Sequence, residues 1–365
     1  MRRSHHDRAI LYGVLLLLCI GTIMVFSTTT AVFGDSHAFN RHLMFGIAGL
    51  AAMAITMRVN YHWYWNRILI YGILGLSAVL LIGALFSPAI NGVNRWLQVG
   101  PFRGQPSELA KLSLIFFTAY FAVEKPHAFR SFNRDLWAYA AVLAGFLLLI
   151  VAEPDLGTAT VVLLICLTLA FLAGLPRISL LAGVAASIPA FYLLVYRVPY
   201  RRDRILAFLD PEHSPLDVSY QIRQSLIAVG SGGWTGLGLG QSKQKLAYLP
   251  EPHTDFIFAI LGEELGLLGT TFIVAAFLFF FWRGIKISLR ADSRFGTYLG
   301  LGVTSMLVLQ ALINLSVVLS LVPTKGIPLP FISLGGSSLV VALAAVGVLL
   351  NISHHGRRRA LELEG

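Results

Sequence analysis

Apolar stretches separated by short polar segments follow one another along almost the whole chain. A membrane-spanning helix needs about 20 apolar residues to cross a hydrocarbon core of about 30 Å. Candidate spans lie near 9–28, 42–57, 67–87, 109–124, 136–152, 157–174, 178–196, 256–282, 296–321 and 334–352. The pattern predicts an all-α polytopic membrane protein with about ten transmembrane helices. The second and tenth spans are short or rich in glycine and serine, and either one could shift this total by one.

Basic residues then orient the predicted spans. Lysines and arginines gather at both chain ends and in alternate loops, as Arg8, Arg58, Arg177 and Arg290 illustrate, whereas the short loops between them hold few. The positive-inside rule therefore places both termini in the cytoplasm. Topology accounts for most of the +10 net charge, so a nucleic-acid partner is not expected. The 56% hydrophobic and 13% charged composition also excludes a soluble domain of this size.

One long extracytoplasmic loop interrupts the spans, at about 197–254. Residues 201–209 have an amphipathic pattern suited to the headgroup region, and 219–229 are compatible with a second short helix. A glycine-rich run around Trp234 follows; it would let backbone N–H groups approach a ligand, or it is a tight structural turn. We expect residues 1–359 to be a single integral membrane domain and 360–365, which break the basic pattern, to be a cloning remnant.

Asp255 lies at the start of the eighth apolar stretch, where a carboxylate is expensive unless it is used or paired. If a helix begins at this residue, its face is shared by Ala259, Gly262, Gly266 and Gly269. Small residues at that spacing pack against another helix. The sequence thus places Asp255 toward the protein interior at the external membrane face, as a reactive acid or simply as a helix cap.

Three further external segments carry polar chemistry. Residues 91–111 bring Arg95, Arg103 and a predicted helix that starts at Pro106, in which Glu108 and Lys111 share a face. That pair is either a self-neutralising ion pair or a contact to a pyrophosphate or sugar. Arg95, Arg103 and Lys111 supply positive charge for an anionic headgroup, or snorkel to the interface. The tryptophans of the two external regions would stack on sugar rings or anchor at the interface: Trp96 and Trp234.

The remaining two external segments are turns. Glu153 and Asp155 share one short turn, which is solvated or holds a partner or cation. Residues 323–338 hold Lys325, Ser337, three prolines and three glycines; irregular backbone at that depth requires cover from protein or a wet cavity. We therefore expect the external segments to converge on one cavity. No metal motif is present; the cofactor question stays open, with Mg²⁺ held loosely by scattered carboxylates as the option.

These motifs together resemble the SEDS family (shape, elongation, division and sporulation), which contains RodA and FtsW. The resemblance covers residues 9–353 and rests on five segments: 91–96, 105–111, 153–157, 249–259 and 326–338. It implies a ten-helix fold in the bacterial cytoplasmic (inner) membrane and peptidoglycan glycosyltransferase activity on lipid II and the growing glycan strand. It also implies a class B penicillin-binding protein as transpeptidase partner. Short cytoplasmic ends favour the RodA branch, whereas residues 243–251 and 323–326 are closer to FtsW.

The resemblance implies a role for Asp255, and the chemistry of the implied reaction suggests roles for its neighbours. Asp255 matches the acid essential in the family and is assigned as general base on the acceptor sugar hydroxyl. Lys111, Arg95 and Arg103 are assigned to the departing pyrophosphate, and Glu108 to orienting Lys111 or to a second acid role. Two alternatives remain open: a lipid II flippase, and a noncatalytic scaffold for the penicillin-binding protein.

Overall fold

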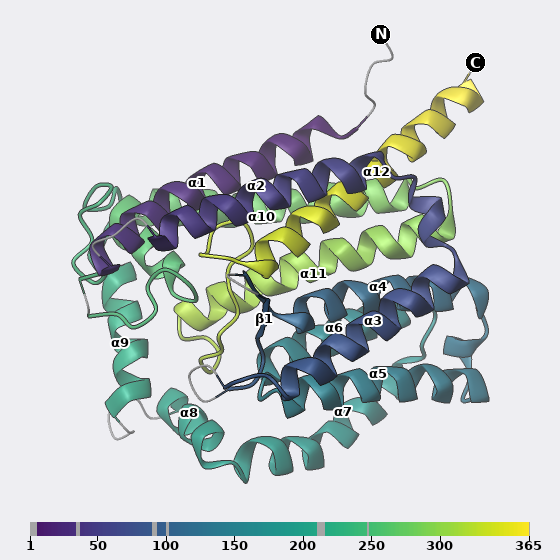
Figure 1. Cartoon of the computed structure of the whole chain (residues 1–365), viewed down its shortest axis with the longest axis horizontal. Helices are drawn as coiled ribbons and strands as arrows, with labels where there is room; N and C mark the ends of the chain where they lie inside the picture. The colour runs from purple at the N-terminus through teal and green to yellow at the C-terminus, as the bar shows by residue number, and fades with distance from the viewer. Residues whose placement is uncertain are drawn as a thin grey trace.

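Helices make up nearly all of the computed structural model, which describes residues 6–33, 37–89, 93–99, 102–209, 216–246 and 248–364. The long helices lie side by side, with both termini at one end of the bundle (Figure 1). Their bounds are α1 (Arg8–Phe33), α2 (His37–Arg58), α3 (Arg67–Leu85), α4 (Pro106–Glu124), α5 (Arg134–Ala152), α6 (Leu156–Leu172), α7 (Arg177–Phe191), α10 (Ile257–Leu289), α11 (Arg294–Val318) and α12 (Ser337–Glu364).

Each of the ten predicted spans falls on one of these helices. Among the described residues, seven are long and apolar enough to cross a membrane by length and composition: α1, α2, α3, α5, α10, α11 and α12. Helix α6 is apolar but shorter. Helix α7 continues into a π-helical turn, η3 (Tyr192–Tyr196), which lengthens the segment that the sequence predicts at 178–196.

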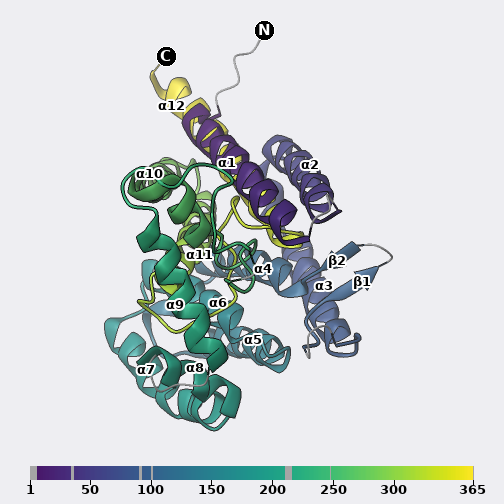
Figure 2. The same ribbon diagram turned by 90° about the vertical axis from the view of Figure 1, so that its left-hand side faces the viewer.

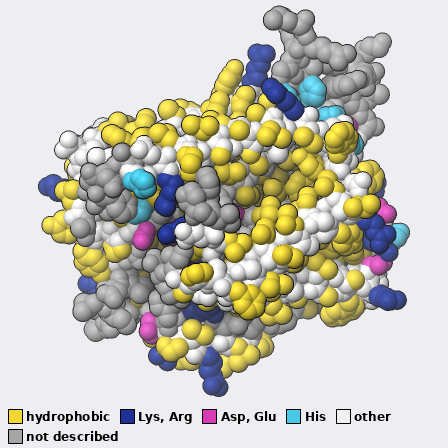
Figure 3. Space-filling view, viewed as in Figure 1, with side chains coloured by type: hydrophobic (Ala, Val, Ile, Leu, Met, Phe, Trp, Pro, Cys, Tyr) yellow, Lys and Arg dark blue, Asp and Glu magenta, His cyan; other side chains and the backbone are white. Residues whose placement is uncertain are grey.

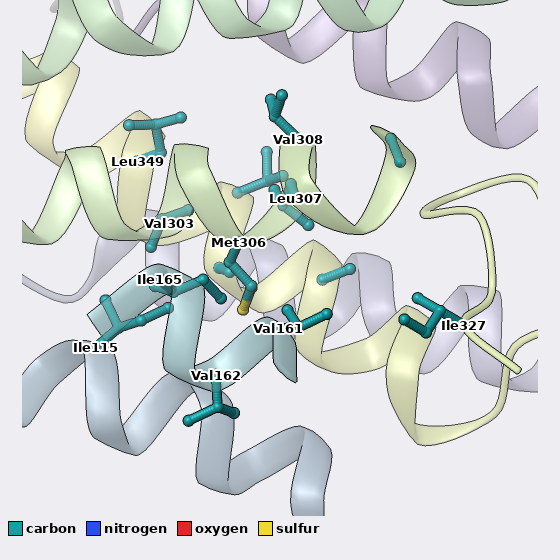
Figure 4. Close-up of a cluster of buried hydrophobic side chains, with 14 of the residues drawn as sticks. Ile115, Val161, Val162, Ile165, Val303, Met306, Leu307, Val308, Ile327 and Leu349 are labelled. Atoms are coloured by element: carbon teal, nitrogen blue, oxygen red, sulfur yellow. The ribbon is translucent and has the colours of Figure 1, made fainter. Parts of the chain in front are cut away.

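Helices α4 and α11 form the centre of the bundle. Helix α11 packs against α10, α4, α6 and α12, and α4 also packs against α3. Figure 4 shows side chains of these central helices meeting, with Ile115 of α4, Ile165 of α6 and Met306 of α11 in one cluster. Gly302 allows the close approach, because a Cβ there would clash with Ile115. Outer surfaces are apolar: hydrophobic side chains cover most of the face in Figure 3, with charged ones mainly toward its margins.

Short elements connect the long helices. Helices α8 (Pro199–Leu209) and α9 (Leu216–Ser231) confirm the two helices predicted in the long loop. A hairpin that the sequence did not predict, β1 (Leu97–Val99) and β2 (Phe102–Gly104), projects beside α3 (Figure 2). At the end that holds the chain termini, the 3₁₀ turns η1 (Tyr61–Tyr64) and η2 (Ala128–Arg130) complete the loops.

Helix α10 breaks at Gly266, where φ is 67° and ψ is −163°. The glycine-rich run fills the break: Leu267 N–H donates to the Gly233 carbonyl at 2.8 Å, and Leu237 N–H donates to the Glu263 carbonyl at 2.9 Å. The backbone groups freed by the break are therefore satisfied by protein, as a span requires. The run is thus a structural turn, the second of its two interpretations. The small-residue face predicted from Ala259 to Gly269 is interrupted at Gly266, so Gly269 does not continue it, although Gly262 does pack against α9.

Candidate active site

Asp255 is the last residue but one before α10. The helix begins at Ile257 after Phe256 as N-cap, with no side-chain cap hydrogen bond, so the helix start predicted at Asp255 is displaced and the helix-cap interpretation is wrong. Within the described chain the half-buried carboxylate accepts no hydrogen bond. It lies against Gly326, where a Cβ would come within 2.8 Å of Asp255 Oδ2.

The surroundings of Asp255 favour its neutral form. Burial raises the pKa of this carboxyl to about 7, and the nearby carboxylates of Glu251 and Asp155 act in the same direction. Arg95 and Arg204 oppose the rise. A carboxyl with such a pKa is ionised in part at neutral pH and is a stronger base than an ordinary aspartate.

Asp155 joins three segments that the sequence predicts to be external. Its Oδ1 accepts the Thr158 N–H at 3.0 Å, which caps α6, and its Oδ2 accepts the Gln105 side-chain amide at 2.7 Å. The Gln105 N–H in turn donates to Ser337 Oγ at 2.9 Å. The segments before α4, α6 and α12 are therefore tied together at the same end of the bundle, as the sequence predicts.

Cationic side chains lie around Asp255 and Asp155. We call these two carboxylates, with Arg95, Arg204 and Lys325, the Asp255 group. Lys325 Nζ donates to Thr160 Oγ1 at 3.3 Å; burial lowers the pKa of its ammonium group and the nearby Asp155 carboxylate opposes that fall. The positive charge of Arg95 lowers the pKa of both the Glu153 and the Asp255 carboxyl. Arg204 of α8 donates to the Thr324 carbonyl at 3.2 Å. Sequence reasoning missed Arg204 as a site residue, because its amphipathic helix indicated only a headgroup contact.

Glu153 is completely buried between α5 and α6. Neither carboxylate oxygen has a hydrogen-bond partner among the described residues. Burial raises the pKa of this carboxyl to about 8, Asp155 adds to the rise and Arg95 opposes it. Glu153 is thus mostly neutral at pH 7, which excludes the solvated turn as its setting.

Replacing Glu153 by Gln should change how thermal stability depends on pH. In the wild type the folded state holds a proton that the unfolded chain releases above pH 4.5, so stability falls as pH rises toward 8. The variant lacks this titration. Each pH unit between the two pKa values changes the stability by about 1.4 kcal/mol, so the melting temperature of the variant relative to wild type should rise by roughly 6–12 °C between about pH 5 and about pH 9. Thermal unfolding of the detergent-solubilised protein measures this, and a difference that is constant with pH would contradict the assignment.

Glu108 and Lys111 form the predicted ion pair, with Nζ 2.9 Å from each carboxylate oxygen. Both side chains are buried in α4, at 6% and 2% exposure. The positive charge of the ammonium group is therefore already balanced by the Glu108 carboxylate in this structure. A direct role for either residue on substrate stays a prediction.

The remaining candidates lie at the margin of the site. Arg103 is exposed on β2, and Trp96 is half-buried with the Arg95 guanidinium 5.8 Å from its ring centroid. Trp234 is 73% exposed in the turn that fills the break in α10. The structure does not bring Trp234 into the Asp255 group, and its sugar contact stays a prediction. Asn91 and Gly92 of the first motif lie outside the described residues.

Two adjacent glutamates of α10 hold the chain that leads to Asp255. Glu263 accepts the N–H groups of Lys243 at 2.9 Å and Gln244 at 3.3 Å, together with the Ser242 hydroxyl. Glu264 forms a buried ion pair with Lys245 at 2.7 Å and accepts the Ser27 hydroxyl of α1 at 2.8 Å. Helices α1 and α10 and the loop at 241–246 are thus locked together by charged hydrogen bonds.

Within the described ranges, no group of three or more histidine, cysteine, aspartate or glutamate side chains is arranged to hold a metal ion. The possible Mg²⁺ contact of Glu153, Asp155 or Asp255 therefore stays open.

Comparison with known proteins identifies relatives of the whole chain. The FtsW, RodA and SpoVE model, described as a cell cycle protein, matches residues 7–358. The probable peptidoglycan glycosyltransferase FtsW of Geobacter sulfurreducens is 41% identical over 96% of this chain and 95% of its own. Stage V sporulation protein E of Bacillus subtilis is 42% identical over 98% and 99%.

Two solved structures are similar along nearly their full length. One is described as a peptidoglycan synthase complex that coordinates polymerization and crosslinking; its chain matches with a TM-score of 0.81, 27% identity and coverage of 97% of this chain and 98% of its own. The other is the rod shape determining protein RodA of Thermus thermophilus, with a TM-score of 0.70, 26% identity and coverage of 95% and 96%.

Proposed function

Because the chain belongs to the cell cycle protein family of FtsW, RodA and SpoVE, we propose that it is a peptidoglycan glycosyltransferase that polymerises lipid II into glycan strands. The observation that carries the proposal is the half-buried Asp255 carboxylate, whose pKa is about 7, among the basic side chains of Arg95, Arg204 and Lys325. The reaction needs two contributions from a protein. One is a carboxylate that can accept a proton, and the other is a set of cations beside it.

The chemistry proceeds by displacement at a sugar. The 4-hydroxyl oxygen of the acceptor sugar forms a bond to the anomeric carbon of the donor, and the bond from that carbon to the polyprenyl pyrophosphate breaks. Asp255 accepts the hydroxyl proton as general base, a role worth about 10²–10⁴-fold in rate. No covalent sugar–enzyme intermediate is needed.

Negative charge develops on the departing pyrophosphate. Arg95, Lys325 and Arg204 are suited to stabilising it, because they belong to the same group as Asp255. Arg103 is exposed at the margin and would meet the headgroup as it arrives. Lys111 contributes directly only if substrate draws it away from Glu108. A Mg²⁺ ion bound with the pyrophosphate would add further positive charge.

The rate of polymerisation should rise with pH through about 7, because Asp255 accepts a proton only in its ionised form. Burial is the main cause of this pKa; the carboxylates of Glu251 and Asp155 raise it further, and Arg95 and Arg204 lower it. Initial rates at saturating lipid II, with folding checked at each pH, test this. A rate that does not change between about pH 5.5 and about pH 8.5 would contradict Asp255 as the base.

We place both termini in the cytoplasm and the active site on the extracytoplasmic side of the bacterial inner membrane. The positive-inside rule supports this orientation. Both termini lie at one end of the bundle, and the Asp255 group lies where α4, α6, α10 and α12 begin, at the other end (Figure 1). The membrane domain spans 1–359 in this proposal, with 360–365 as a cloning remnant.

We propose a class B penicillin-binding protein as partner, since a similar chain occurs in a complex that coordinates polymerization and crosslinking. For the branch, the curated relatives near 40% identity are FtsW and stage V sporulation protein E, whereas the RodA structure is 26% identical. These identities favour a division or sporulation role and weaken the RodA assignment that the short chain ends suggested.

The decisive experiment is polymerisation of labelled lipid II by the purified protein with its penicillin-binding partner, the transpeptidase being blocked. Glycan strands made by the complex, and absent with either the partner alone or no protein, support the proposal. Absence of polymer from the folded complex overturns it. Movement of labelled lipid II across liposomes then distinguishes a flippase from a noncatalytic scaffold.

A further inference from the structure

In the segment that leads into α10, three consecutive backbone carbonyls are each held by a hydrogen bond. Leu334 N–H donates to the His253 carbonyl at 2.9 Å, and Ser333 Oγ donates to the Thr254 carbonyl at 2.6 Å. The Asn314 side-chain amide donates to the Asp255 carbonyl at 2.8 Å. The backbone that carries Asp255 is therefore fixed from one side by α11 and by the loop between α11 and α12.

Asn314 also holds the loop that it faces. Its second amide hydrogen donates to the Ile327 carbonyl at 2.8 Å, so one NH₂ group joins the Asp255 segment to the segment of Lys325 and Gly326. Ser333 repeats this arrangement, since its hydroxyl also accepts the Leu329 N–H at 2.8 Å. Two side chains thus set the distance between the two segments.

That distance matters at Gly326. A Cβ at this residue would lie 2.8 Å from Asp255 Oδ2, so the carboxylate rests directly on the glycine backbone. If the segments separated, the carboxylate would gain both freedom and water. Misplacement of a catalytic group by about 1 Å can cost about 10²-fold in rate.

The position of Asn314 is otherwise hard to account for by stability alone. It is 1% exposed near the end of α11, and its own Oδ1 has no hydrogen-bond partner among the described residues. A buried polar group without a partner costs free energy. The residue that carries this cost lies where α11 contacts the Asp255 segment, which favours a role in that contact.

We propose that Asn314, supported by Ser333, is a positioning residue for the glycosyltransferase reaction, holding the Asp255 carboxylate at a fixed place beside the Lys325 loop. The inference rests on the proposed function. Asn314 touches neither substrate nor reacting atoms in this scheme; it acts through the backbone of Asp255.

The test compares Asn314→Leu and Ser333→Ala with Asn351→Leu. Asn351 is a matched control: it is 2% exposed and bridges the Tyr61 N–H and the Met57 carbonyl at the opposite end of the bundle. For each variant in complex with the penicillin-binding partner, kcat, KM for lipid II, the pH profile and the melting temperature are measured.

We expect kcat to fall about 10–10²-fold in Asn314→Leu and about tenfold in Ser333→Ala, with KM within about threefold of wild type. The acid limb of the pH profile should also move to lower pH, because a loosened Asp255 gains water and its pKa falls toward the ordinary value. Asn351→Leu should lose thermal stability while its kcat stays within about twofold and its pH profile is unchanged.

Two outcomes overturn the inference without touching the proposed function. One is a wild type that polymerises beside Asn314→Leu and Ser333→Ala variants of unchanged kcat and pH profile. The other is loss of activity in all three variants only in proportion to lost folding. A wild type that makes no polymer overturns the proposed function and the positioning role with it.

Discussion

Replacing Asp255 by Asn or Ala is expected to reduce glycan polymerisation by about 10²–10⁴-fold, the usual worth of a general base. Asn keeps nearly the same shape as Asp but cannot accept a proton. The neutral amide also removes a negative charge that lies near the carboxylates of Asp155 and Glu251, so repulsion between like charges decreases. Folding and partner binding should therefore survive, and the effect should appear in kcat. Residual activity should lose the rise with pH near 7.

Asp135→Asn is the matched control for this experiment. Asp135 lies in the first turn of α5, at the same end as the termini, and its exposed ion pair with Lys125 has side-chain exposures of 50% for Lys125 and 44% for Asp135. Its loss should leave polymerisation within about twofold, since exposed pairs contribute little. Normal polymerisation by a folded, partner-bound Asp255→Asn complex would show that another group takes the proton. The alternative base would then be sought among Glu251 and Asp155.

The spans could be predicted from the sequence because their cause is local. About 20 apolar residues in a row have few stable arrangements other than a membrane helix, and caps such as Ser293 before α11 mark their starts. The Glu108–Lys111 pair was equally local, since spacing of three residues puts both side chains on one face of α4. Patterns within single elements were therefore sufficient to predict most of the helices.

Contacts between distant segments were beyond such patterns. Nothing in the local sequence of α8 indicated that Arg204 would reach the Thr324 carbonyl 120 residues later. Asn314 was hidden for the same reason, because its two acceptors lie 59 and 13 residues away along the chain. The break in α10 also depends on tertiary structure: Gly266 leaves the helix only because residues 233–238 supply the missing hydrogen bonds.

The largest loss of stability is expected from Lys245→Met. This change removes the ammonium group but leaves the Glu264 carboxylate fully buried, with the Ser27 hydroxyl as its one remaining donor among the described residues. Breaking one side of a buried ion pair costs about 3–5 kcal/mol. We expect a melting temperature lower by roughly 6–15 °C, measured on the solubilised protein, on the usual relation between the two quantities.

The double variant Lys245→Met with Glu264→Gln should recover most of this loss, because no uncompensated charge remains and the amide oxygen of the introduced glutamine can still accept the Ser27 hydroxyl. Lys125→Met is the control: it breaks an exposed pair of similar length, 3.2 Å, and should cost less than about 1 kcal/mol. If Lys245→Met cost no more than Lys125→Met, the buried pair would not hold the loop. A double variant as unstable as the single one would instead assign the loss to packing of the lysine stem. Because the 241–246 loop leads directly into the Asp255 segment, the single variant should also polymerise more slowly at temperatures well below its melting point.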